Sequence, residues 1–235
     1  MFTVRKKEER GSTEASWLKS QHSFSFGEYY DPQNMGFGHL RVINEDWIIP
    51  ESGFGTHGHK NMEIVTYILA GELTHKDSLG TGSVIRPGEV QLMSAGKGIL
   101  HSEVNASPLA EVHLLQIWIM PNEQNTRPKY QQKAFPPEQM QNRFRLIVSP
   151  NGENGSLMIK QDAKVLALRL AAGQTASVEM SARRKYWLQV AQGGVVRAQN
   201  QPLEAGDALA IDHEQGTLTL TAHQETEVLL FDLPQ

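Results

Sequence analysis

Residues 53–73 have the sequence GFGTHGHKNMEIVTYILAGEL, which joins a glycine- and histidine-rich segment to a continuous apolar run. The run, Ile64–Ala70, is rich in β-branched and aromatic residues and is followed by Gly71. A short run of this kind closed by a glycine turn predicts a buried β-strand. In the segment before it, His57 and His59 point to the same face of an extended chain, because they lie two positions apart. The stretch therefore predicts β-structure that presents two imidazoles side by side.

Outward from this stretch, short β-rich runs recur along the whole chain, separated by Pro, Gly and Asp turns. The runs cover residues 39–43, 46–49, 63–70, 90–93, 112–120, 145–148, 165–170, 186–191, 208–211, 217–221 and 226–232. One short helix is expected at Pro137–Arg143, where proline lies near the start. Many short strands and almost no helix predict an all-β sandwich, jelly roll or barrel.

A weak internal repeat predicts two similar β domains. The text TYILAGEL at 66–73 resembles WLQVAQGGV at 187–195, and each is a strand that runs into a glycine turn. Between the two copies, Pro121–Asn142 is rich in Asn, Gln and Pro and is expected to be a connector. We therefore expect an N-terminal domain at 1–130 and a C-terminal domain at 131–235.

The composition of the 235 residues excludes several classes of function. Lys and Arg number 22 against 26 Asp and Glu, so the chain has no cationic surplus for binding nucleic acid directly. It contains no cysteine, which excludes disulfides, thiolate metal sites and cysteine nucleophiles. The charged N-terminus and the lack of any apolar run of about 20 residues lead us to expect a cytoplasmic protein without a membrane segment. Any metal must be held by His, Asp or Glu.

A second pair of candidate ligands lies about forty residues beyond the first. His101 and Glu103, in the text GILHSE, again lie two positions apart, so each pair has Cα atoms roughly 6.6 Å apart on one face of a strand. Taken singly, an HxH pair in a surface loop, a core histidine or a solvated glutamate would each be ordinary. The joint occurrence of both pairs beside glycines favours a metal site with three nitrogens and one oxygen. Such a donor set suits Fe(II), Mn, Co, Ni, Cu or Zn, and on an octahedral ion it leaves two positions open.

The same residues resemble a known family. His57, His59, Glu63 and Gly71 resemble the first motif of the cupins, and the text from Gly98 to His101 resembles the second. More narrowly, the first half of the chain resembles the pirins, close to the bacterial pirin-like quercetin dioxygenases. The matching segments are FSFGEYYDP, GFGHLRVINED, GFGTHGHKNMEIVTYILAGEL, HKDSLG, IRPGEVQLMSAGKGILHSE and LLQIWI. Over the second half the resemblance rests on β content and length.

This resemblance implies an all-β bicupin, two jelly-roll domains with few short helices. It implies one divalent ion in the N-terminal domain, Fe(II) first and Zn, Co, Ni, Mn or Cu as alternatives. The implied ligands are His57, His59, His101 and Glu103. Other cupins use the glutamate of the first motif, here Glu63, but its Cα would lie roughly 13 Å from that of His59 in a straight strand. We expect Glu63 either to orient a ligand or bound water, or to pair with a nearby lysine, Lys60 or Lys97.

The second half lacks these ligands. With Gly193 matched to Gly71, the histidine positions fall near 179–182 and 217–221, and neither window contains histidine. We therefore expect the C-terminal domain to have no metal site and to serve packing. His75 lies in one of the family-like segments, but its spacing does not predict a ligand.

The implied activity is a metal-dependent quercetin 2,3-dioxygenase, which opens the heterocycle of a flavonol with O₂ and releases CO. Glu103 is the expected general base for the flavonol 3-hydroxyl. The expected partners are a flavonol or similar phenol and O₂, and we expect a monomer. The alternative is a metal-containing regulatory protein that binds transcription factors or enzymes, with the oxygenase activity incidental. A cupin isomerase or lyase is a third, less favoured alternative.

Overall fold

The computed structural model describes all 235 residues, which divide into two compact units. The first unit is Gly11–Ala134 with Ile159–Gln161, and the second is Met1–Arg10, Phe135–Met158 and Asp162–Gln235. The first ten residues thus group with the C-terminal half, and the boundary at 130/131 stays a prediction. Strand β1 (Phe2–Arg5) pairs with β20 (Ala208–Ile211), so the N-terminus completes the edge of a sheet in the second unit.

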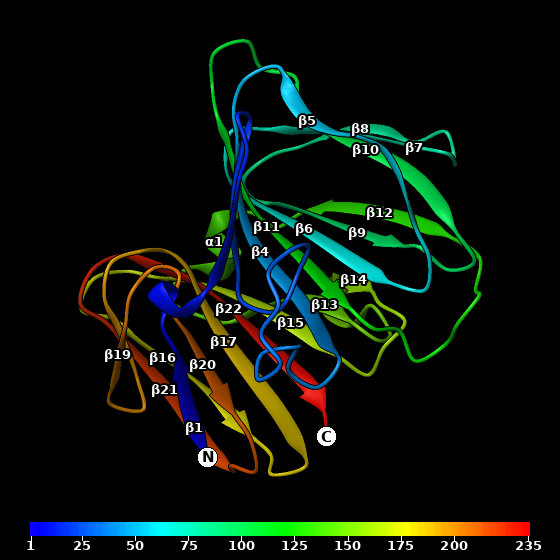
Figure 1. The fold of residues 1–235 in the computed structure, drawn as a ribbon. Helices are drawn as coiled ribbons and strands as arrows, with labels where there is room; N and C mark the ends of the chain where they lie inside the picture. The colour runs from blue at the N-terminus through cyan, green and yellow to red at the C-terminus, as the bar shows by residue number, and fades with distance from the viewer. The chain divides into compact units, whose positions relative to one another are not determined.

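The first unit contains two antiparallel sheets, one larger than the other (Figure 1). The strands are β2 (Gly11–Glu14), β3 (Leu18–His22), β4 (Leu40–Ile48), β5 (Ser52–His59), β6 (Glu63–Ala70), β7 (Leu73–Asp77), β8 (Gly82–Ile85), β9 (Glu89–Ser94), β10 (Ile99–Asn105), β11 (Val112–Ile119) and β12 (Lys129–Ala134). The seven-stranded sheet has the order β12-β9-β6-β11-β4-β3-β2, and the four-stranded sheet has the order β5-β10-β7-β8.

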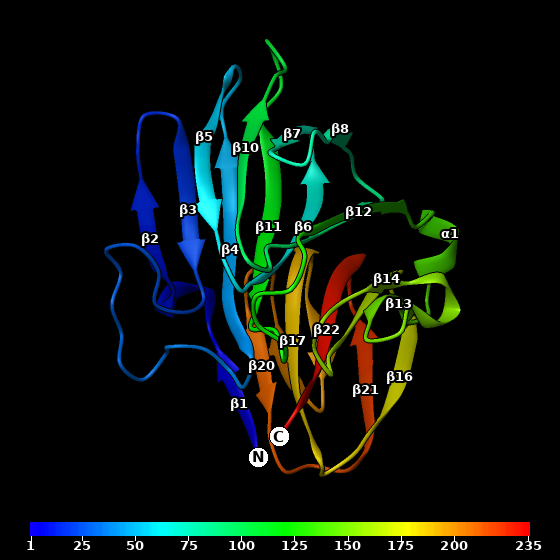
Figure 2. The same ribbon diagram turned by 90° about the vertical axis from the view of Figure 1, so that its right-hand side faces the viewer.

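The second unit has the same plan, visible beside the N- and C-termini in Figure 2. Its strands, besides β1 and β20, are β13 (Arg145–Ser149), β14 (Leu157–Met158), β15 (Lys164–Leu170), β16 (Thr175–Met180), β17 (Arg184–Gly193), β18 (Val196–Ala198), β19 (Gln201–Leu203), β21 (Gly216–Ala222) and β22 (Thr226–Pro234). The orders are β1-β20-β17-β22-β15-β13-β14 and β16-β21-β18-β19. The number and order of strands repeat those of the first unit, except that β14 pairs parallel with β13, whereas β2 pairs antiparallel with β3.

The predicted repeat is confirmed at its two glycines. Gly71 directly follows β6, with φ of 74°, and Gly193 is the last residue of the equivalent strand β17, with φ of 99°. A Cβ on Gly71 would lie 2.5 Å from the carbonyl oxygen of Glu111, and one on Gly193 would lie 2.3 Å from that of Glu225. Both glycines therefore allow the chain to turn left-handed against the start of the next sheet strand.

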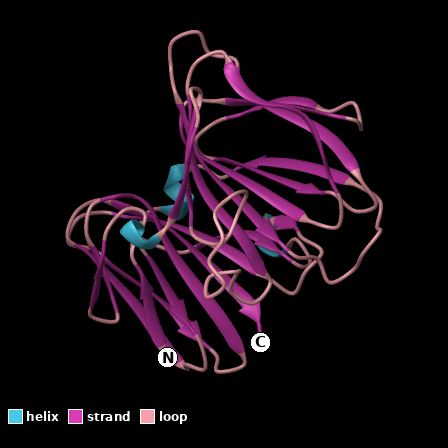
Figure 3. Ribbon diagram, viewed as in Figure 1, coloured by secondary structure: helices cyan, strands magenta, loops and turns pink.

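The all-β prediction is confirmed, and helices are few and short (Figure 3). They are α1 (Pro137–Met140) and the 3₁₀ turns η1 (Lys7–Glu9) and η2 (Glu153–Gly155). The predicted helix at 137–143 ends three residues early, where Gln141 is extended. The runs at 39–43 and 46–49 form the single strand β4. The prediction of a connector at 121–142 was wrong in part, because this segment contains β12, an edge strand of the large sheet. No helix is long and apolar enough to cross a membrane.

The interior of the second unit is apolar where the first unit has its histidines. β16 and β21, the equivalents of β5 and β10, place Ala176, Met180, Leu218 and Leu220 in a continuous hydrophobic core. Alternate residues of these strands bear hydroxyls that pair with one another, as Ser177 does with Thr219. The strand alternation that presents ligands in the first unit therefore presents a packed core in the second.

Candidate metal centre

Two neighbouring strands of the small sheet present the predicted side chains. β5 and β10 are antiparallel, and His101 lies directly opposite His57 in the register. The register then shifts between His101 and Glu103, because β5 has one extra residue at this point, and Glu103 lies opposite Phe54. A bulge of this kind bends a strand and re-aims its side chains. The alternation of side chains along each strand thus brings the two pairs together. Because of the bulge, Glu103 lies opposite Phe54 and is offset from His57 and His59.

The three imidazoles form a tight group. Ligand atoms of His57, His59 and His101 all lie within 4.8 Å of one another. The Nε2 atoms of His57 and His101 are 3.0 Å apart, and their ring centroids are 4.4 Å apart. The Nδ1 atom of His57 lies 2.8 Å from the carbonyl oxygen of Gly55, which can only accept a hydrogen bond. That contact places the ring proton on Nδ1 and leaves the Nε2 lone pair directed at His101.

His59 and His101 are neutral at physiological pH. Burial and then the neighbouring His57 lower the pKa of His59 to about 4. Burial, followed by repulsion from His57 and His59, lowers the pKa of His101 to about 3. A buried Nδ1 of His101 has no hydrogen-bond partner. Neutral imidazoles that converge are the form that binds a metal ion, so this donor set fits a single divalent ion.

Glu103 is buried at the edge of this group. Its Oε2 accepts a hydrogen bond of 2.8 Å from Nε2 of Gln116, and its Oε1 lies 3.4 Å from Oγ1 of Thr66. Burial raises its pKa to about 7, although both hydrogen bonds lower it. A second group of ligand atoms within 4.8 Å comprises His75, His101 and Glu103. The two groups share His101, so the predicted four residues meet around that imidazole, with Glu103 offset from His57 and His59.

A row of buried polar side chains crosses the large sheet beneath Glu103. Across neighbouring strands, His22 lies opposite Asn44, Asn44 opposite Gln116, Gln116 opposite Thr66, and Thr66 opposite Gln91. Within this polar row, the Nε2 of Gln91 donates to Thr66 over 3.0 Å, and the hydroxyl of Thr66 lies 3.2 Å from Oε1 of Gln116. The row therefore fixes the amide that holds the Glu103 carboxylate.

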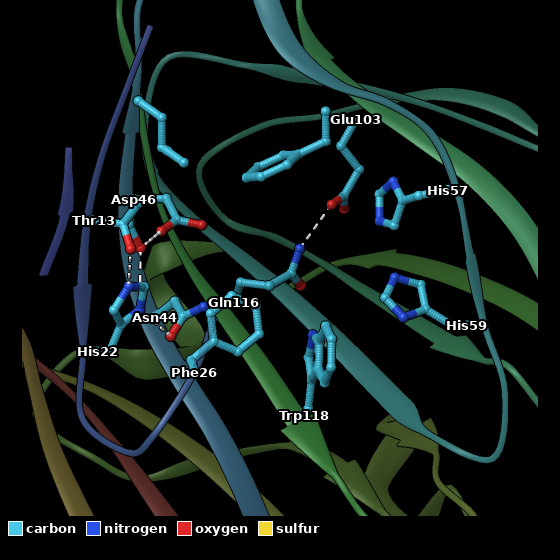
Figure 4. Close-up of a pocket in the computed structure, with 13 residues that line it drawn as sticks. Thr13, His22, Phe26, Asn44, Asp46, His57, His59, Glu103, Gln116 and Trp118 are labelled. Atoms are coloured by element: carbon cyan, nitrogen blue, oxygen red, sulfur yellow. Dashed lines mark hydrogen bonds between the residues drawn. The ribbon is translucent and has the colours of Figure 1, made fainter. Parts of the chain in front are cut away.

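His57, His59 and Glu103 line one cavity of about 210 Å³, together with His22, Asn44 and Gln116 of the polar row (Figure 4). Trp118 packs edge-on against His59 with centroids 4.9 Å apart, and Phe26 packs edge-on against Trp118 at 5.4 Å. Phe54 and Leu18 complete the apolar wall. Two phenylalanines, Phe26 and Phe54, line the cavity, whereas Phe24 is buried and Tyr30 is 73% exposed. An apolar cavity of this kind suits a flat aromatic ligand.

Glu63 has neither of its expected partners. Its Oε2 accepts hydrogen bonds from the hydroxyl of Ser94 at 2.8 Å and from the backbone N–H of Lys160 at 3.2 Å. Burial raises the pKa of this carboxyl group. The expected hydrogen bond to a metal ligand and the expected ion pair with Lys60 or Lys97 were therefore wrong, because Glu63 anchors the Ile159–Gln161 segment. Its orientation of a bound water stays a prediction.

Several residues of the site were missed in the sequence. His75 is fully buried, its Nε2 lies 3.0 Å from Asp77 Oδ2, and its ring lies 5.3 Å from that of His101. Spacing could not reveal it, because His75 comes from β7, on the far side of β10 from β5. The polar row was detectable in principle. Thr66, Gln91 and Gln116 are polar residues inside otherwise apolar strands, and a polar side chain at a buried position needs a partner.

Comparison with known proteins agrees with this architecture. Residues 3–119 match the family model described as Pirin, and residues 146–233 match that of the quercetinase C-terminal cupin domain. The chain is 44% identical over 234 residues to the quercetin 2,3-dioxygenase of Escherichia coli strain K12, covering 100% of this chain and 99% of that protein. It is 40% identical over 223 residues to a pirin-like protein of Caulobacter vibrioides, covering 94% of this chain and 95% of that one.

Solved structures show the same likeness. The crystal structure of YhhW from Escherichia coli superposes with a TM-score of 0.95 at 44% identity, over 100% of this chain and 98% of that one. A second structure, of the bacterial pirin YhhW in complex with nickel(II), superposes with a TM-score of 0.94 at 44% identity, over 100% and 99% of the two chains. The fold and site are thus those of a two-domain cupin, and the chain belongs to the pirin family. The bicupin expectation is confirmed.

Proposed function

We propose that this protein is a metal-dependent dioxygenase that opens the heterocyclic ring of flavonols such as quercetin. The observation that supports it most strongly is the convergence of His57, His59, His101 and Glu103, three of which line one end of an aromatic-walled cavity. The likeness to a full-length relative named quercetin 2,3-dioxygenase supports the same reaction. With flavonol and O₂ as substrates, the products are a ring-opened ester and CO.

We propose His57, His59, His101 and Glu103 as the ligands of one divalent ion, and Fe(II) as that ion in the cell. Imidazole with carboxylate also suits Zn, Co, Ni, Mn and Cu. The 3.0 Å between the Nε2 atoms of His57 and His101 supports a shared ion. Two nitrogens bound at right angles, each roughly 2.1 Å from one ion, would have about this separation. When bound, such an ion supplies a Lewis acid that makes a coordinated hydroxyl more acidic.

The chain's own residues then have separate tasks. Glu103 is the proposed general base, because its buried carboxylate lies beside the histidines and can take the proton of the flavonol 3-hydroxyl. Oε1 is the oxygen available for this proton, because Gln116 holds Oε2 with the shorter hydrogen bond. Phe26, Phe54 and Trp118 hold the flat ring system and exclude water from it.

The test is O₂ uptake and CO release with quercetin, measured on protein reconstituted with Fe(II), Ni(II) or Zn(II). We expect one O₂ consumed for each CO released. Glu103→Gln keeps the size of the side chain but removes the base, and it should lower kcat by roughly 100-fold or more. His213→Ala, at a histidine whose side chain is 75% exposed, is the matched control.

Turnover far below roughly 1 s⁻¹ with every metal would contradict the dioxygenase proposal. Stoichiometric metal without turnover would instead favour the alternative, a metal-containing protein that binds a regulatory partner. A monomeric state and a cytoplasmic location stay predictions of the sequence.

A further inference from the structure

The end of the cavity away from His57 and His59 has a second polar cluster (Figure 4). It is formed by Thr13 of β2, by Ser20 and His22 of β3, and by Asn44 and Asp46 of β4. Asp46 is 3% exposed, and so is Asn44. The two side chains lie on the same face of β4, two positions apart, and both line the cavity. The proposed mechanism assigns them no task.

Hydrogen bonds inside the cluster engage one polar atom of Asp46 and one of Asn44, and they leave the other polar atom of each side chain free. The hydroxyl of Ser20 donates to Oδ1 of Asp46. Nδ1 of His22 donates to Oδ1 of Asn44 over 2.8 Å, and Nε2 of the same ring lies 2.8 Å from the hydroxyl of Thr13. No hydrogen bond involves Oδ2 of Asp46 or Nδ2 of Asn44. Figure 4 shows one Asp46 oxygen turned to its hydrogen bond and the other toward the middle of the cavity.

This leaves an acceptor and a donor on the same face of β4, both on the wall of the cavity. A buried carboxylate satisfied on one oxygen only is unfavourable, and burial raises the pKa of Asp46 to about 7, with repulsion from Glu103 adding to the effect. In a stable protein, such unpaired atoms in a cavity wall are expected where a ligand completes their hydrogen bonds.

We propose that Asp46 and Asn44 form a subsite for a phenolic hydroxyl of the substrate other than the 3-hydroxyl that faces the metal centre. The inference rests on the proposed function and adds a specificity-determining pair to it. A phenolic hydroxyl both donates and accepts, so it can give its proton to Asp46 Oδ2 and receive one from Asn44 Nδ2.

The surroundings select this chemistry over its competitors. A ligand carboxylate would be repelled, because Asp46 and Glu103 face the same cavity. A sugar would place its hydroxyls against Phe26, Phe54 and Trp118, where none could be satisfied. A hydroxylated aromatic ring satisfies both the apolar walls and the polar pair.

The test compares substrates and variants by binding alone. Protein loaded with Ni(II) is titrated under argon, by absorbance, with 3-hydroxyflavone, galangin and quercetin, which have one, three and five hydroxyls. We expect Asp46→Ala to weaken quercetin binding roughly 10- to 100-fold while changing 3-hydroxyflavone binding less than about threefold. Asp46→Asn, which keeps an acceptor oxygen and the size of the side chain, should restore part of the affinity.

Glu45→Gln is the matched control, since Glu45 precedes Asp46 on β4 but pairs with His113 on the opposite face of the strand. Melting temperature and metal content, measured for every variant, identify any loss of folding. If Asp46→Ala weakens galangin binding more than 3-hydroxyflavone binding, the hydroxyl bound by the subsite is at position 5 or 7. If only quercetin binding is weakened further, that hydroxyl is on the 2-phenyl ring. Equal effects on all three flavonols, or none, would overturn the subsite while leaving the dioxygenase proposal intact. Failure of the wild-type protein to bind any flavonol would overturn both.

Discussion

His57 and His101 face each other across adjacent strands, with their Nε2 atoms 3.0 Å apart and the ring proton of His57 held on the opposite side by Gly55. Two lone pairs would repel at this distance, so without an ion the Nε2 of His101 must keep its proton and donate it to His57. A metal ion removes the need for that proton and binds both nitrogens. Metal binding and histidine protonation therefore compete at this pair.

Loss of one histidine of the pair should abolish metal binding. In His101→Ala we expect the metal content to fall from about one ion per chain to below about 0.1, because two of the remaining ligands are half exposed and hold the ion weakly. Added Ni(II) should raise the melting temperature of the wild type but not of the variant. Metal analysis and thermal melting check both expectations. Unchanged metal content in the variant would contradict the proposed site.

The amide of Gln116 should matter through the carboxylate that it holds. Gln116→Leu removes the 2.8 Å hydrogen bond to Glu103, and we expect metal affinity to fall roughly 10- to 100-fold. The second unit offers a matched control, since Nε2 of Gln192 donates to Oε2 of Glu227 over the same 2.8 Å. Gln192→Leu should leave metal affinity unchanged. Competition with a chelator measures both variants, and equal effects would rule out a specific role for Gln116.

Asp46 should impose a pH dependence on the stability of the metal-free protein. The pKa of Asp46 is about 7 in the folded state, above its ordinary value of 3.8. Between these two pH values, the folded protein keeps a proton on Asp46 that the unfolded chain has lost. The resulting stability is complete below about pH 4 and is lost as the pH rises through 7. The Asp46→Asn variant has no carboxyl group at this position, so its stability does not fall with pH in this way.

The advantage of Asp46→Asn over the wild type should therefore grow between pH 4.5 and 7.5, by on the order of 3 kcal/mol. Urea unfolding at the two pH values measures it. His59 and His101, whose lowered pKa values give the opposite dependence, are present in both proteins, so their contribution cancels in the difference. A pH-independent difference for Asp46→Asn would show that its carboxyl group titrates normally.

The two repeat glycines should be equally intolerant of a side chain. Gly71→Ala and Gly193→Ala each force a residue with φ near 74° or 99° against a carbonyl oxygen, and each should cost at least about 2 kcal/mol of unfolding free energy. Gly82→Ala, with open space around it and no positive φ, should change stability by less than about 0.5 kcal/mol. Denaturant unfolding compares all three, and a tolerated Gly193→Ala would weaken the structural equivalence of the two turns.

Local patterns predicted much of this molecule because they depend on short-range geometry. Strand parity placed His57 and His59 on one face, and His101 and Glu103 on another, since side chains alternate along any strand. The β-rich run at 63–70 has the same bounds as β6, and its apolar part, Ile64–Ala70, reflects a strand that is buried on both faces. The edge strand β12 was missed, since its exposed and half-exposed polar side chains resemble those of a loop.

What the sequence alone determined is therefore the β class, the duplication and the identity of the four candidate ligands. Only the tertiary structure decided how these residues meet. The bulge that sets Glu103 apart from His57, the burial of His75 beside His101, and the pairing of β1 with β20 all depend on which strands become neighbours. The same holds for the polar row and for Asp46. Each is one polar residue in its own strand, and hydrogen bonding across the sheet makes it part of a site.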